Sequence, residues 1–221
     1  MESKGGGGNG LGAPSTFSSV AAYHSHMTRK VVLSAGISLD GYVARLDGAV
    51  DYLFMPKDYS MGPFFATVDA AVMGRKTYEA ALKMGGEAML KSGGMEYYVF
   101  SKALAPGARN YVTFVNEPIP EFVEKLRAKP GKNIWHMGGG ELARAFLQED
   151  LIDELYLGIV PKLIGEGLPM FPPSYPERHF ALKESKTYGG GLLTLTYERV
   201  RDGGAATASS RKRPAKAKRK K

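Results

Sequence analysis

Between residues 29 and 201, short apolar runs alternate with stretches in which apolar side chains recur at helical spacing. Short apolar runs bounded by glycine or polar residues are typical of buried strands. They predict strands at residues 30–37, 69–73, 96–100, 111–115, 133–137, 151–160, 180–188 and 192–200. Helical spacing predicts one helix from about Thr77, with Tyr78, Ala81 and Leu82 on one face, and others between residues 119 and 126 and around Leu142 and Phe146.

The order of these elements predicts the fold class. Strands that alternate with helices favour an α/β fold, a mostly parallel sheet with helices on both faces. The last two strands are joined by three glycines at residues 189–191 and predict an antiparallel C-terminal hairpin. In such sheets ligands bind at the carboxyl ends of the strands, so chemistry is expected in the turns that follow them.

Both ends of the chain lack this pattern. Residues 1–28 are rich in glycine and serine and predict a flexible leader without the apolar centre of a secretory signal. Residues 202–221 predict a disordered basic tail, leaving one domain at residues 29–201. The eight basic residues of 211–221 account for the whole net charge of +8. Any contact with nucleic acid is therefore expected to be non-specific and through the tail.

Composition removes several classes of function. The chain has no Cys, which excludes disulfides, a thiolate nucleophile and Cys-ligated metals. It has no apolar run near the roughly 20 residues of a membrane-spanning helix, so no membrane partner is expected. We expect a soluble cytoplasmic protein, with a nuclear location as the alternative because the tail resembles a localisation signal.

One group of polar residues follows the predicted strand at residues 69–73. Gly74, Arg75, Lys76 and Thr77 occupy the turn into a helix, where unpaired backbone N–H groups favour a phosphate. Cations are unfavourable at a helix N-terminus unless an anion is expected there. The alternative is a solvated helix start with two chance basic residues.

Two further groups follow other strands. Ser101 and Lys102 offer a hydroxyl and an ammonium group for a ribose phosphate, or simply open a loop. Gly138, Gly139 and Gly140, followed by Glu141 and Leu142, let the backbone approach a pyrophosphate closely, although their spacing is not the Rossmann fingerprint. The alternative is a tight turn, for which we expect one glycine to be enough rather than three.

Together these segments resemble the dihydrofolate reductase-like superfamily, and within it stand-alone relatives of the riboflavin-pathway reductase, the C-terminal domain of the bifunctional deaminase-reductase. The resemblance is carried by SLDGYVA (38–44), VDAAVMGRKTYE (68–79), YYVFSK (97–102), WHMGGGELARAFL (135–147) and LIDELYLGIVPKLIGEGLPMF (151–171).

The resemblance implies an NADPH-dependent oxidoreductase that delivers hydride to a small-molecule substrate, and a homodimer. The implied cofactor-binding residues are Gly74, Arg75, Lys76, Thr77, Ser101, Lys102, Gly138, Gly139, Gly140, Glu141 and Leu142. Cationic and hydroxyl-bearing sites favour NADPH over NADH, because its extra phosphate needs charge-assisted donors.

The substrate side is carried over onto four residues. Asp58 lies upstream of Gly74, where dihydrofolate reductases hold a catalytic acid, on a stretch where two phenylalanines suggest a helix; an exposed loop acid is the alternative. Asp40 is implied as catalytic or as a turn former, and Tyr52 as a pocket or core residue. Met137, implied to contact substrate, stands where riboflavin-pathway enzymes usually have an acid.

This departure leaves three functions open. The first is a reductase of the 5-amino-6-(5-phosphoribosylamino)uracil type that acts on a pyrimidine or pteridine. The second is dihydrofolate reductase activity itself. The third is a catalytically silent protein that binds NADPH or is tethered to nucleic acid.

Overall fold

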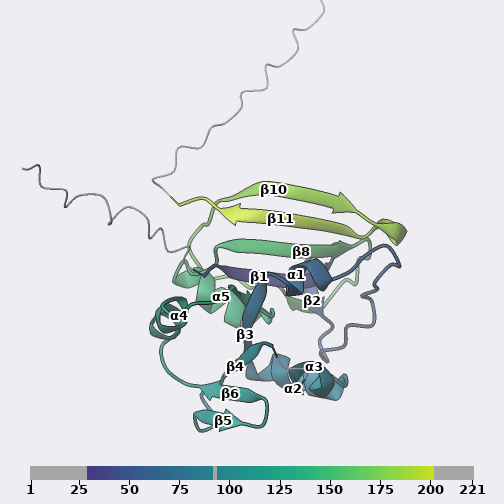
Figure 1. Ribbon diagram of the computed structural model, residues 1–221. Helices are drawn as coiled ribbons and strands as arrows, with labels where there is room; N and C mark the ends of the chain where they lie inside the picture. The colour runs from purple at the N-terminus through teal and green to yellow at the C-terminus, as the bar shows by residue number, and fades with distance from the viewer. Residues whose placement is uncertain (1–28, 92–93, 202–221) are drawn as a thin grey trace, which may run out of the picture.

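The computed structural model describes residues 29–91 and 94–201 (Figure 1). The predicted leader at residues 1–28 and the predicted basic tail at 202–221 lie outside the described residues. Within the described part, strands and helices alternate along the chain as the hydrophobic pattern predicts.

A nine-stranded sheet organises the domain, in the order β10-β11-β8-β1-β7-β3-β4-β6-β5. The six inner strands from β8 to β6 are parallel to one another. They are β1 (Val31–Ser38), β3 (Val68–Gly74), β4 (Glu96–Phe100), β6 (Val112–Val115), β7 (Asn133–His136) and β8 (Glu154–Val160). The predicted strands therefore form the predicted mostly parallel sheet.

Antiparallel strands close both edges of this sheet. β10 (Phe180–Thr187) and β11 (Leu193–Arg199) form the predicted C-terminal hairpin, and Gly189–Gly191 make a 3₁₀ turn between them. β5 (Gly107–Arg109) pairs antiparallel with β6 at the other edge. This edge strand was not predicted, because its three residues are exposed and carry no apolar pattern.

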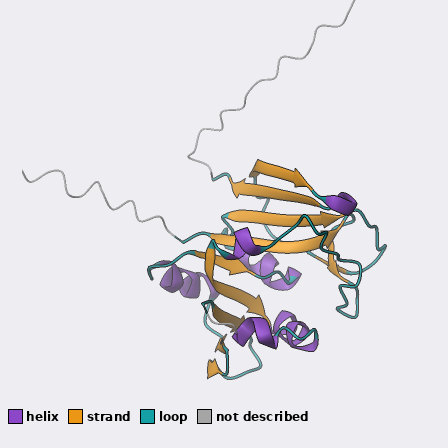
Figure 2. Ribbon diagram, turned by 45° about the vertical axis from the view of Figure 1, so that its right-hand side comes forward, coloured by secondary structure: helices purple, strands orange, loops and turns teal. Residues whose placement is uncertain are grey.

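Helices cover both faces, and the alternation of side chains along the strands explains why. On β1, Val31 and Leu33 pack in one cluster and Val32 in another. The first cluster contains the apolar faces of α4 (Ile119–Arg127) and α5 (Gly140–Gln148). The second contains side chains from α1 (Gly62–Phe65), α2 (Arg75–Lys83) and α3 (Glu87–Lys91). Figure 2 shows the helices on either side of the strands.

A second, two-stranded sheet was not predicted. β2 (Tyr42–Ala44) pairs antiparallel with β9 (Leu168–Pro169). β9 lies close to the start of α5, because a Cβ added to Gly140 would overlap the Pro169 carbonyl oxygen. Through β9, this small sheet therefore packs against the turn between β7 and α5.

Candidate functional site

The helices α2 and α5 begin side by side, at the carboxyl ends of the neighbouring strands β3 and β7. Their first turns are in contact: a Cβ at Gly139 would lie 2.6 Å from Thr77 Oγ1, and one at Gly74 would lie 4.0 Å from Leu142 Cβ. Both N-cap residues are glycines, and neither helix has a side-chain cap. Two helix N-termini therefore present backbone N–H groups and partial positive charge to one place.

Formal charge adds to this field on the α2 side. Arg75 and Lys76 stand in the first turn of α2, which contains no acid. Arg75 Nη1 lies 2.7 Å from Glu79 Oε1 in the next turn, and Lys76 is exposed. On α5, Glu141 occupies the first turn, but it is 78% exposed and pairs with Arg144 at 2.6 Å. The joint surface of the two helix starts fits an anion better than a cation.

Ser101 and Lys102 follow β4, the strand next to β3. Ser101 is buried, and its Oγ accepts the backbone N–H groups of Ala103 at 3.3 Å and Leu104 at 3.1 Å. Lys102 is exposed on this turn. The Ser101 hydroxyl therefore orders the turn that presents the Lys102 ammonium group.

Each of the three glycines between β7 and α5 has its own steric reason. Gly138 and Gly139 adopt φ values of +83° and +90°, which residues with a Cβ rarely adopt. Gly140 faces the Pro169 carbonyl oxygen, which leaves no room for a Cβ. The expectation that a tight turn needs only one glycine is therefore wrong, and the run of three does not by itself require a pyrophosphate.

His136 lies directly beneath this turn and was not among the predicted site residues. It ends β7, is fully buried, and its Nδ1 accepts the Gly138 backbone N–H at 3.1 Å. Burial lowers the pKa of His136 to about 4, so the imidazole is neutral at physiological pH. The signal in the sequence was a residue with an acceptor two positions before a glycine, the spacing of an Asx-type turn.

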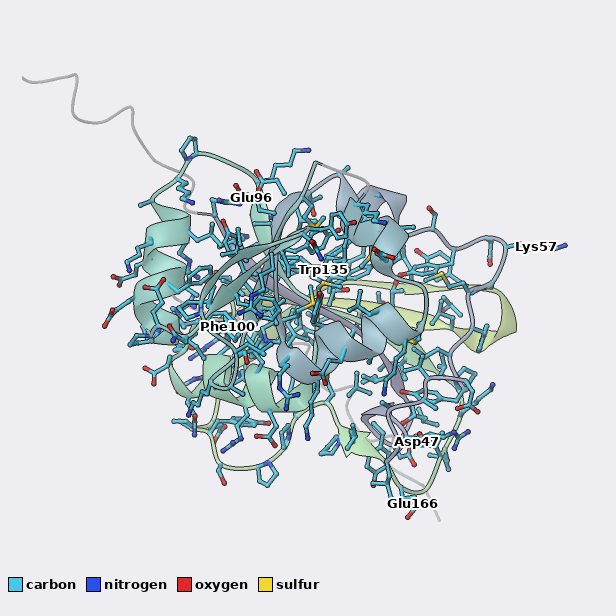
Figure 3. The ribbon with its side chains drawn as sticks, turned by 90° about the horizontal axis from the view of Figure 1, so that it is seen from below. Asp47, Lys57, Glu96, Phe100, Trp135 and Glu166 are labelled. Atoms are coloured by element: carbon cyan, nitrogen blue, oxygen red, sulfur yellow. The ribbon has the colours of Figure 1, made fainter. Side chains whose placement is uncertain are left out.

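Met137 and Trp135 belong to the opposite face of β7. Both pack in the cluster that contains Phe64 of α1, and Met137 is half-buried. The Trp135 ring meets the rings of Phe64 and Phe65 edge-on, with centroids 5.6 Å and 5.4 Å apart. Its Nε1 has no hydrogen-bond partner among residues 29–91 and 94–201. Figure 3 shows Trp135 in the middle of the molecule, away from the loops that carry Asp47 and Glu166.

Asp58 lies in a turn before α1, not on a helix as the sequence suggested, because α1 extends only over Gly62–Phe65. Its side chain is exposed, and its two oxygens accept the Gly189 backbone N–H at 3.1 Å and 3.0 Å. The structure therefore places Asp58 beside the turn of the β10–β11 hairpin. Its catalytic role stays a prediction.

Asp40 is exposed and fastens the loop that precedes β9. Its carboxylate accepts hydrogen bonds from Ser38 Oγ at 2.5 Å and from the backbone N–H groups of Ile164 at 3.0 Å and Gly165 at 2.8 Å. These bonds, above all the one from Ser38, lower the pKa of Asp40, so the carboxylate stays ionised. The geometry gives Asp40 a role in ordering the loop, and its catalytic role stays a prediction.

Tyr52 is in the core. Only 2% of its surface is exposed, and its hydroxyl donates to the Tyr42 carbonyl oxygen at 2.7 Å. Burial raises its pKa to about 12. It packs with Val160 and Leu192, which is the core alternative that the sequence left open.

Three further features bear on the site. Among the residues that the structure describes, no group of His, Cys, Asp or Glu side chains could hold a metal ion. No described helix is both long and apolar enough to cross a membrane.

A hollow of about 240 Å³ is lined by Glu96, Tyr98 and Tyr111. Glu96 begins β4 and Phe100 ends it (Figure 3), so the lining of this hollow includes the amino end of the strand but not its carboxyl end.

The chain is similar to two proteins of Bacillus subtilis. It is 36% identical over 166 residues to the uncharacterized protein YwjB of Bacillus subtilis, covering 74% of this chain and 94% of YwjB. It is 29% identical over 182 residues to the uncharacterized protein YyaP of the same organism, covering 76% and 94%.

The chain is also similar to proteins of known structure. A protein from Shewanella sp. PV-4 that is named for riboflavin biosynthesis shares 28% identity with a TM-score of 0.68, covering 78% of this chain and 99% of that one. A deaminase/5-amino-6-(5-phosphoribosylamino)uracil reductase from Thermotoga maritima shares the fold, at 15% identity and a TM-score of 0.60. The match covers 78% of this chain and 57% of the Thermotoga chain.

The family match extends over most of the described domain. The RibD C-terminal domain matches residues 29–194, from the first residue of the described region into β11. The aligned part contains both helix starts, the turn after β4 and the glycine turn. The chain therefore belongs to the RibD C-terminal domain family, a reductase-like family of the riboflavin pathway.

Proposed function

We propose that this protein is an NADPH-dependent reductase that acts on a pyrimidine or pteridine ring. One observation carries the proposal: α2 and α5 begin in contact at the ends of β3 and β7, without side-chain caps and with two cations in the first turn of α2. Backbone N–H groups at two helix starts are the donors that a pyrophosphate needs. The residues present therefore fit the dinucleotide that the family implies.

Each part of this surface has a distinct task. The N–H groups at the starts of α2 and α5 would hold the pyrophosphate, and Gly138 and Gly139, at positive φ and without side chains, would let it approach the backbone. Lys102, on the turn that Ser101 orders, would pair with the 2′-phosphate. NADPH is favoured over NADH because the Lys102 ammonium group pairs more strongly with a phosphate than with a ribose hydroxyl.

The cofactor supplies hydride when bound, and the chain supplies placement. Met137 directly follows β7, next to the glycine turn, on the face that also carries Trp135 and α1. An apolar and aromatic surface at this position favours a flat heteroaromatic substrate. The acid that riboflavin-pathway enzymes usually have at the Met137 position is missing, so a ribose-phosphate substituent would have one polar contact fewer.

The experiment is NADPH binding and oxidation with purified protein. We expect Arg75→Ala combined with Lys102→Ala to weaken NADPH binding by roughly a hundredfold, since each lost charge-assisted contact contributes about 1.5 kcal/mol or more. The matched control removes two exposed lysines elsewhere, Lys83→Ala with Lys129→Ala, and should change affinity by less than about threefold. Equal affinities for both double variants would overturn the cofactor assignment.

Turnover separates the candidate activities. Oxidation of NADPH is followed by its near-ultraviolet absorbance with 5-amino-6-(5-phosphoribosylamino)uracil and, separately, with dihydrofolate. Turnover of the first alone supports the riboflavin-type reductase, and turnover of dihydrofolate alone supports dihydrofolate reductase activity. Tight NADPH binding without turnover of either would exclude both named activities.

A further inference from the structure

His136 occupies an unusual place for a titratable side chain. It is the last residue of β7, none of its surface is exposed, and its ring meets that of Phe146 on α5 edge-on, with centroids 4.9 Å apart. It therefore lies between the sheet and the helix whose N-terminus forms half of the candidate site. An apolar residue would fill this space without the cost of burying an imidazole.

The polar atom that faces the glycine turn explains why an imidazole is present. Nδ1 accepts the Gly138 backbone N–H at 3.1 Å, which requires Nδ1 to be unprotonated and assigns the proton of the neutral ring to Nε2, which is buried without a hydrogen-bond partner among the described residues. The bond joins a side chain to the backbone two residues later, as Asn and Asp do in Asx turns. His136 is thus the side-chain half of a local turn motif.

The turn needs this anchor because glycine alone does not specify it. Gly138 and Gly139 have φ values of +83° and +90°, and glycine reaches such values as readily as negative ones. The hydrogen bond to His136 fixes the peptide of Gly138 at the start of the turn. Beyond it, the Gly139 carbonyl oxygen accepts the Ala143 N–H at 3.0 Å and opens α5. The direction of the first α5 amides therefore depends on the Gly138 peptide.

We propose that His136 is a positioning residue: its Nδ1 holds the glycine turn in the conformation that directs the N-terminal amides of α5 at the cofactor. The role in cofactor binding rests on the proposed function, whereas the role in holding the turn does not. The structural alternative is that His136 only fills space against Phe146. The positioning role depends on a hydrogen-bond acceptor bonded to Cγ, whereas the space-filling role depends on the volume of the ring.

Two substitutions separate these properties. His136→Asn keeps an acceptor, Oδ1, attached to Cγ as Nδ1 is, but leaves a smaller side chain. His136→Phe keeps a ring of similar size and removes the acceptor. We expect His136→Asn to bind NADPH within about threefold of wild type and His136→Phe to bind about tenfold more weakly, the effect of one lost hydrogen bond. Ile134→Val, a fully buried neighbour on the same face, controls for a general loss of core packing and should leave affinity unchanged.

Hydrogen exchange of the Gly138 amide is the second readout and needs no cofactor. We expect the Gly138 amide to exchange about tenfold faster in His136→Phe than in wild type, and at nearly the wild-type rate in His136→Asn and Ile134→Val, because only His136→Phe removes the acceptor. Nitrogen chemical shifts of the imidazole in wild type should report a proton on Nε2.

The outcomes distinguish this inference from the proposed function. If wild type does not bind NADPH, the proposed function fails, and the exchange of the Gly138 amide still decides whether His136 holds the turn. If His136→Phe matches wild type in both affinity and exchange, or His136→Asn loses as much as His136→Phe, the positioning role is overturned. Faster exchange with unchanged affinity would overturn the link from the turn to the cofactor.

Discussion

The buried imidazole of His136 makes the stability of the domain depend on pH in a way that can be isolated. In the unfolded chain a histidine has its ordinary pKa of 6.5, whereas burial lowers the pKa of His136 to about 4 in the folded protein. Between these two values the unfolded chain binds a proton that the folded protein excludes. Stability from the neutral imidazole is therefore fully present above about pH 6.5 and is lost as the pH falls toward 4.

The size of the effect follows from the two pKa values. Each tenfold difference in proton affinity between the folded and unfolded states corresponds to about 1.4 kcal/mol. The gap between 6.5 and about 4 therefore corresponds to a loss of about 3 kcal/mol over the whole interval. Such a loss is about a fifth or more of the 5–15 kcal/mol that stabilises a typical domain. Most carboxylates titrate at lower pH, so pH 5 to 7 is the informative window.

Urea denaturation at a series of pH values between 5 and 7 measures this contribution. The chain contains one tryptophan, Trp135, which is 8% exposed on the neighbouring position of β7, so its fluorescence reports unfolding. We expect the free energy of unfolding of wild type to fall by up to about 1.4 kcal/mol per pH unit at the lower end of this window. His136→Asn should lack this component and show a flatter dependence.

The test compares how steeply the free energy of unfolding depends on pH in wild type and in His136→Asn. The other three histidines, His24, His26 and His179, are the same in both proteins, so any contribution from them cancels in the difference between wild type and variant. Equal slopes for wild type and His136→Asn would refute the reasoning, because the proton uptake would then belong to another group. A variant that is less stable at every pH by the same amount has lost packing and not a titration.

Two further predictions test the walls of the site. Gly140→Ala should destabilise the domain by about 2–3 kcal/mol, because its Cβ would overlap the Pro169 carbonyl oxygen. Gly158→Ala is the tolerated control, because its Cβ would meet Leu192 Cδ1 at an ordinary 3.7 Å. Thermal unfolding measures both variants, and equal shifts in their midpoints would contradict the steric argument. Asp40→Asn and Asp58→Asn should each leave NADPH affinity unchanged. If either carboxylate is catalytic, its variant should lose much of kcat and show an altered pH dependence of turnover. An unchanged kcat in both variants would remove both residues from the catalytic set.

The hydrophobic pattern predicted the strands of the large sheet well, because burial of a strand requires apolar side chains along it. Strands such as β3 and β4 are buried on both faces and read as continuous apolar runs, and α4 and α5 show their apolar stripes directly. The small elements β2, β5 and β9 escaped because two or three residues carry no period. The four-residue helix α1 contains the two phenylalanines that favoured a helix, but it is too short to include Asp58.

The position of the candidate site was also predictable from the sequence. Residues that follow neighbouring parallel strands must meet at one edge of the sheet, so Gly74, Ser101 and Gly138 could be assigned to the same edge. Their individual roles were not predictable in this way. Ser101 Oγ accepts backbone N–H groups of its own turn, and Gly140 is required by Pro169, which is distant in sequence.

By itself, the sequence therefore determined the class of fold, with helices on both faces of a mostly parallel sheet, and predicted the edge of that sheet at which a ligand should bind, because these follow from local periodicity and strand order. Only the tertiary structure decided that α2 and α5 begin in contact, that Tyr52 is a core residue and that His136 is buried against Phe146 of α5. The physical reason is that each of these depends on distances between segments that the chain brings together only on folding. A residue type shows what a side chain can do, and its neighbours in space determine which of those things it does.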